Sequence, residues 1–274
     1  MSIIQKDVLS LEFKRGLKRL LIWSISLGMT IFLIVIIYPM VADMMAVILD
    51  MFEYLESINS AFIGMLDSFG GIPENAVEYF ATEGALFLQL LGGIFAALVG
   101  FNAISRDEKE RTAEVIYVLP ISRDQLFRTK ITTIFIQILV FSIFQFGLAQ
   151  LAFLFVAPNM NYGLFWKFAG YDLILFLMIA YLSFGLAIFM KPNQSSLIAV
   201  AIPFPFYIIT MISGLTDNTF LKNLKYISPF TFADPVQVLK EGSSLEWVNF
   251  LIFIILTFSV IILALARFRK RPIF

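Results

Sequence analysis

The chain has 274 residues, of which 59% are hydrophobic and 15% charged, whereas a soluble domain is about half apolar and a quarter charged. It contains neither Cys nor His, which excludes disulfides, thiolate metal sites, thiol nucleophiles and histidine bases. Basic and acidic residues balance at 20 each, so the net charge does not favour a nucleic-acid partner.

Six apolar runs are long enough to cross a lipid bilayer, which takes about 20 helical residues. They cover residues 20–41, 85–105, 131–157, 168–190, 196–215 and 247–266. A chain of this length cannot bury six such helices in water, so we predict an all-α, polytopic membrane protein. Pro203 and Pro205 predict that the fifth span is kinked or partly unwound.

The basic residues predict how the chain is oriented. All but four of the 20 Lys and Arg residues fall in the N-terminal segment, the loops after spans two and four, or the C-terminal tail. The exceptions are Lys167, Lys222, Lys225 and Lys240. Because loops rich in Lys and Arg stay in the cytoplasm, we expect both termini to be cytoplasmic in a cell-membrane protein.

The segments outside the spans complete the predicted organisation. Residues 1–17 are expected to form a cytoplasmic interfacial helix that precedes a six-span transmembrane domain over 18–274. Residues 42–84 are expected to form an external helical cap whose acids either gather cationic solutes or form a solvated face. Residues 216–246 are expected to form short external or re-entrant helices.

The loop at residues 106–130 carries most of the functional signal. Arg106 and Glu110 are opposite charges four residues apart, which favours a helix that continues from the second span. Pro120 ends that helix, and a capping box at Ser122 starts the next one. The pattern predicts a helix, a corner and a second helix, which form either a docking surface for a cytoplasmic protein or an ordinary solvated loop.

Two motifs in this loop resemble the coupling region of ABC-2 type transporter permeases. They are the charged stretch from Arg106 to Glu114 and the sequence Leu-Pro-Ile-Ser-Arg at 119–123. The stretch at 226–230, Tyr-Ile-Ser-Pro-Phe, precedes the last span and is similar to that family too. The predicted topology matches it over nearly the whole chain.

The resemblance implies the permease subunit of an ABC exporter for a peptide, an antibiotic or a lipid-like molecule. It implies two kinds of partner, namely ABC ATPase subunits and a second permease subunit that is identical or homologous. ATP and Mg would bind to the ATPase, and this chain would bind no cofactor. The sequence agrees, since it has no G-x-x-x-x-G-K-[ST] phosphate loop.

The resemblance also assigns the contact with the ATPase to the loop at 106–130. The residues concerned are Arg106, Glu108, Glu110, Arg111, Thr112, Glu114, Leu119, Pro120, Ile121, Ser122 and Arg123.

Two further sets of residues lie within the spans. Gly92, Gly93, Ala96 and Gly100 permit close approach of the second span to another helix, either within the chain or in a second subunit. The candidates for a transport pathway are Gln89, Asn102, Gln137, Phe141 and Gln145. The amides among them either hydrogen-bond between helices or line a cavity, because unpaired amides are costly in lipid.

Other classes of function fit the sequence less well. The spans are almost free of ionisable groups, Asp172 being the exception, which speaks against a proton-driven transporter. An ATP-independent secondary transporter or channel that uses backbone and hydroxyl ligands is the main alternative. A membrane anchor for a partner ATPase is another, while a membrane enzyme would need catalytic pairs that the spans lack.

Overall fold

The computed structural model describes residues 6–44, 73, 75–110, 121–191, 194–214, 218–240 and 245–271. These residues form helices and no strand, and six helical segments are long and apolar enough to cross a membrane. The predicted all-α polytopic class is therefore confirmed. Most of the predicted cap at 42–84 lies outside the described residues.

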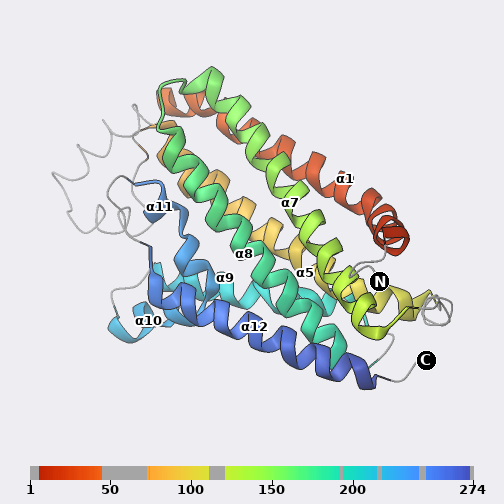
Figure 1. Cartoon of the computed structure of the whole chain (residues 1–274). Coiled ribbons are helices and arrows are strands. Elements are labelled where there is room, and N and C mark those ends of the chain that lie inside the picture. The colour runs from red at the N-terminus through yellow and green to blue at the C-terminus, as the bar shows by residue number, and fades with distance from the viewer. Residues whose placement is uncertain are drawn as a thin grey trace.

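Long helices run side by side through the molecule, and the start of the first and the end of the last lie near one end, which we call the terminal end (Figure 1). The long helices are α1 (Lys6–Ile36), α5 (Ala85–Lys109), α7 (Arg123–Val156), α8 (Tyr162–Phe189) and α12 (Trp247–Lys270). The shorter ones are α4 (Ala76–Tyr79), α9 (Pro203–Gly214), α10 (Thr219–Asn223) and α11 (Pro235–Val238). Short 3-10 helices cover Ser196–Ala201, Leu224–Ile227 and Pro229–Ala233.

The helices associate mainly as two pairs. α1 packs along α7, and α5 packs along α8, whereas α5 and α7 contact each other far less. α12 covers α8 from the other side. The chain that joins α5 to α7 therefore joins one helix pair to the other.

α1 runs without a break through residues 17–18, where the predicted interfacial helix meets the predicted transmembrane domain. The predicted interfacial helix and the first span are one continuous helix. Val8, Glu12, Gly16 and Leu20 are all buried at intervals of four residues, so the same face of α1 stays in contact with its neighbours across the predicted boundary.

The second span begins earlier than the apolar run suggests. Asn75 caps α4 by accepting hydrogen bonds from the backbone of Val77 and Glu78, and a π-helical turn at Phe80–Gly84 leads directly into α5. The side chain of Asn75 thus satisfies amide groups that would be unpaired at a helix start. The whole segment Ala76–Lys109 is one candidate span.

The fifth span is partly unwound, as its prolines predict. Its first part is the 3-10 helix Ser196–Ala201, and the α-helical part starts at Pro203. Proline has no backbone N–H to donate, so it fits the first turn of an α-helix better than the interior.

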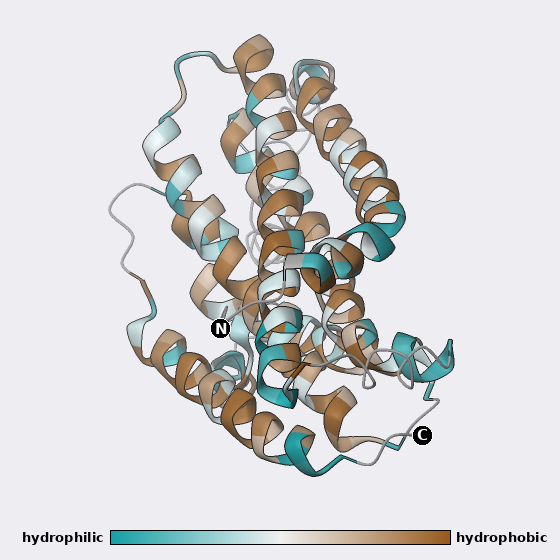
Figure 2. Cartoon of the chain, turned by 45° about the vertical axis from the view of Figure 1, so that its right-hand side comes forward, coloured by the Kyte–Doolittle hydropathy of each residue, from teal (hydrophilic) through white to brown (hydrophobic). Residues whose placement is uncertain are grey.

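Phenylalanine supplies the largest side chains of the interior. The largest fully buried side chains of the described residues are all Phe. Phe95 and Phe141 lie 4.4 Å apart between ring centroids, and Phe80 meets Phe153 edge-on at 5.4 Å. Figure 2 shows that hydrophobic residues dominate the long helices and that hydrophilic ones concentrate near their ends, as a bilayer requires.

Candidate functional site

A buried group of charges joins three helices at the terminal end, and we call it the charge cluster. Its members are Glu12 and Arg15 of α1, Arg106 and Asp107 of α5, and Lys130 of α7. Lys130 is 2% exposed, and its Nζ donates to Glu12 Oε1 at 2.8 Å, to the Ala103 carbonyl at 2.6 Å and to Asp107 Oδ2. An ammonium group has three donors, so this one is fully satisfied.

The two carboxylates of the charge cluster each receive a second cation. Arg106 Nη2 lies 2.8 Å from Glu12 Oε2, and Arg15 Nη1 lies 2.8 Å from Asp107 Oδ1. Arg15 also pairs with Glu110, just past the end of α5. Buried charges are tolerated only when they are paired in this way, because each loses its hydration.

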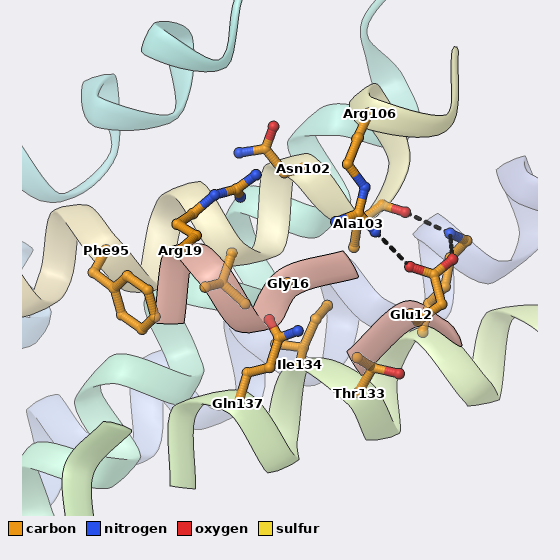
Figure 3. A pocket seen from close by; sticks show the side chains of 12 residues that line it. Glu12, Gly16, Arg19, Phe95, Asn102, Ala103, Arg106, Thr133, Ile134 and Gln137 are labelled. Carbon is orange, nitrogen blue, oxygen red and sulfur yellow. Dashed lines mark hydrogen bonds and ion pairs between the residues drawn. The ribbon is translucent and has the colours of Figure 1, made fainter. Parts of the chain in front are cut away.

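A cavity of about 20 Å³ lies beside the charge cluster. In Figure 3 the Arg106 side chain extends toward Glu12, while the Arg19 side chain extends toward Asn102. Gln137 of α7 also lines the cavity. This volume is enough for about one water molecule.

A second set of contacts ties the end of α12 to the same region. Arg271 Nε lies 2.9 Å from Glu108 Oε1, and Arg271 Nη2 lies 2.6 Å from the same oxygen. Its Nη1 donates to the carbonyl oxygens of Ala187 and Ile188 in the last turn of α8. Carbonyls in a last helical turn lack partners within the helix, so a single guanidinium links the ends of α5, α8 and α12.

The start of α7 is held to the end of α12 as well. Arg123 Nη1 donates to the Phe268 carbonyl at 3.1 Å and to the Arg271 carbonyl. Arg269 forms a bidentate pair with Asp124, at 2.7 and 2.6 Å, but this pair is exposed. Exposed ion pairs contribute little to stability.

These contacts hold both stems of the predicted coupling loop. The predicted capping box is confirmed. The backbone N–H of Gln125 donates to Ser122 Oγ at 3.2 Å, and the backbone N–H of Ser122 donates to Gln125 Oε1 at 3.1 Å. Ile121 packs against the hydrophobic core. The predicted contact residues that fall outside the described residues are Arg111, Thr112, Glu114, Leu119 and Pro120.

A family model described as an ABC-2 family transporter protein matches residues 7–272. The chain belongs to the ABC-2 transporter family. The match runs from the first turn of α1 to just beyond α12, so it includes every span. No curated protein matches the chain. Family membership supports a membrane subunit of an ABC transporter.

In this ABC-2 permease the small residues of α5 pack within the chain. A Cβ built at Gly100 would overlap the Ala180 carbonyl of α8, and one built at Gly92 would lie 2.5 Å from the Phe176 ring. Gly93 faces Pro203 and Ile179, and Ala96 is fully buried. The structure shows that α5 packs closely at Gly92 and Gly100 against α8 inside the chain.

The pathway candidates take part in contacts between helices. Gln145 Nε2 donates to the Ser24 carbonyl at 3.1 Å, and Asn102 accepts from Ser196 Oγ at 2.8 Å. The Phe141 ring packs against two other Phe rings of the core. The structure brings Asn102 and Gln137 to the same small cavity and places the other candidates elsewhere.

Gln89 is a pathway candidate whose side chain donates two hydrogen bonds to two other segments. Its Nε2 donates to Asp172 Oδ1 at 3.0 Å and to the Ala233 carbonyl at 2.6 Å, and both side chains are buried. It therefore joins α5, α8 and the end of the 3-10 helix Pro229–Ala233. That 3-10 helix is wholly buried, so the predicted external segment folds back into the bundle here.

Replacing Gln89 by Leu is expected to lower the free energy of unfolding by about 1–3 kcal/mol, because a buried carboxyl and a buried carbonyl lose their donor. Unfolding of the purified chain in detergent measures this. Gln237, which is exposed, supplies the control, since Gln237→Leu should change stability by less than about 0.5 kcal/mol. Equal effects of the two changes would contradict the role of Gln89.

Most residues of the charge cluster were not predicted from the sequence as functional residues. Glu12, Arg15 and Lys130 were outside the predicted contact set, although Glu12 gives a usable signal. It is an acid on the same four-residue stripe as Val8 and Leu20, which are buried. An acid on a buried stripe needs a cation from another helix.

Proposed function

We propose that the chain is the permease subunit of an ATP-driven exporter and that a separate ATPase docks on the loop at 106–130. The observation that carries this proposal is the charge cluster. Buried ion pairs bind the α5 stem of the loop to α1 and α7, and Arg271 binds it to α8 and α12. A displacement of the loop would therefore move the spans with it, because the stem of the loop is fixed to them and does not act as a flexible hinge.

The packing of the helices suggests what such a push does. The loop joins the α1–α7 pair to the α5–α8 pair, and the two pairs are held together at the terminal end by the charge cluster. Closure of the ATPases would rotate one pair against the other around this base and open a path at the opposite end. Rigid-body rotation of packed units is a common form of switching.

The same proposal implies the other subunits of the transporter, its orientation and its cargo. Two such permeases, identical or homologous, would pair in the cell membrane, each with an ATPase that holds ATP and Mg. The distribution of Lys and Arg supports cytoplasmic termini and a cytoplasmic loop at 106–130. A peptide, an antibiotic or a lipid-like molecule is the proposed cargo.

Charge reversal in the loop tests this function. With the permease and its proposed ATPase partner co-expressed, Glu114→Lys should reduce the co-purified ATPase at least about tenfold, which corresponds to about 1.4 kcal/mol of binding. Asp43→Lys makes the same charge change on an exposed residue beyond the C-terminal end of α1 and should leave the complex intact.

Two outcomes would contradict the proposal. One is full retention of the ATPase and of ATP-dependent transport by Glu114→Lys. The other is transport by the chain alone in vesicles that contain no ATP, which would support a secondary transporter or channel.

A further inference from the structure

A groove along the first half of α1 combines cationic and apolar side chains. It has a volume of about 310 Å³ and is lined by Arg15, Lys18, Arg19, Ile22 and Trp23. Positions separated by three or four residues lie on the same side of a helix, so these five form one stripe. The cations occupy its first half and the apolar side chains its second half.

The apolar part of this stripe continues along the span. Ile22, Ile25, Met29 and Leu33 are 58%, 52%, 46% and 58% exposed in the single chain, which is the exposure expected of residues that face lipid tails. The cationic half therefore stands where α1 leaves the apolar part of the bilayer. Trp23 lies at that boundary, where aromatic side chains are enriched.

The charges around the groove do not balance. Arg15, Arg106 and Lys130 each pair with carboxylates, but Arg19 forms no ion pair among the residues that the structure describes. Arg106 Nε is buried without a hydrogen-bond partner, and Arg106 lines the same small cavity as Arg19. Among the residues that the structure describes, cations in this region thus outnumber the acids that pair with them, which favours a bound anion.

We propose that this groove binds the phosphate headgroup of an anionic glycerophospholipid. The phosphate lies between Arg19 and Lys18, and the acyl chains follow the exposed stripe from Ile22 to Leu33. A lipid matches both halves of the groove, whereas a free anion would use only the cationic half. The proposal does not depend on an ATPase partner, because the groove belongs to α1 alone.

Quenching of Trp23 by brominated lipids tests the proposal on the full chain. Trp166→Phe and Trp247→Phe leave Trp23 as the remaining tryptophan. We expect brominated phosphatidylglycerol to bind at least about tenfold more tightly than brominated phosphatidylcholine when vesicles contain both lipids. Equal quenching by the two lipids would overturn the proposal.

Variants of α1 show whether the lipid preference comes from a specific site or only from the total positive charge of the helix. Arg19→Gln should remove most of the preference for phosphatidylglycerol, and Arg19→Lys should keep most of it. Lys14→Gln removes one charge from an exposed position of α1 outside the groove and should leave the preference unchanged. The proposal is wrong if Arg19→Gln and Lys14→Gln have the same effect.

Competition identifies the source of the phosphate. Inorganic phosphate, at a concentration equal to that of the lipid headgroups, should not displace brominated phosphatidylglycerol. Displacement by inorganic phosphate would show a site for a free anion and would overturn the assignment to lipid.

Discussion

Lys130→Met is expected to destabilise the folded chain by about 3–5 kcal/mol, because removing one partner leaves uncompensated charges in a buried site. Lys130 is the shared partner of Glu12 and Asp107, which are 3% and 5% exposed. The substitution keeps an unbranched side chain of similar length, so the loss reflects charge more than volume. Thermal or denaturant unfolding of the purified chain in detergent measures it.

Two controls show whether burial is the cause. Glu12→Gln should destabilise the natural chain more than it destabilises the Lys130→Met chain, because Glu12 pairs with both Arg106 and Lys130 in the first and with Arg106 alone in the second. Arg269→Met breaks the Arg269–Asp124 pair, whose side chains are 55% and 37% exposed, and should cost less than about 1 kcal/mol. Equal losses from Lys130→Met and Arg269→Met would contradict the assignment of the cluster as a buried structural base.

Gly100→Ala is expected to cost about 1–3 kcal/mol or more, because its added methyl group overpacks a contact between two helices. The new Cβ would overlap the backbone carbonyl of Ala180, which cannot turn away as a side chain can. α5 and α8 would have to separate. Unfolding in detergent gives the stability, and a cross-link between α5 and α8 would report their separation.

Gly170→Ala is the matched control for Gly100→Ala. Gly170 lies in α8 with open space where its Cβ would stand. Alanine favours a helix over glycine by about 1 kcal/mol, so this change should be neutral or stabilising. If both substitutions shift the unfolding midpoint in the same direction by similar amounts, the close contact at Gly100 is not as described.

Local patterns in the sequence are sufficient to predict the spans and the start of α7. Six apolar runs correspond to six candidate spans, and the capping box at Ser122 is present as predicted. Both depend on residues close together in the chain. The sequence did not show that the expected interfacial helix at 1–17 and the first span form one continuous helix, which the buried stripe of α1 explains. The interfacial position of residues 1–17 stays a prediction.

Contacts between distant segments could not be predicted from the sequence. Glu12 and Lys130 are 118 residues apart, and composition shows that each needs a partner but not which one. The spacing of Gly92 and Gly100 likewise predicts a close approach without identifying α8 as the helix that approaches. Such pairings depend on how the helices are arranged in space, which a single sequence does not encode in its local patterns.

Cross-linking from a single cysteine tests most directly whether the loop at 106–130 receives the ATPase. The natural chain has no Cys, so Thr112→Cys provides a unique attachment point in the loop for a photoreactive maleimide. Asp43→Cys provides one beyond the C-terminal end of α1, away from the loop. In membranes that contain the co-expressed ATPase, we expect a covalent product with the ATPase from position 112 and none from position 43. A product from position 43 alone, or reaction of position 112 with an impermeant maleimide added outside intact cells, would contradict the proposed coupling.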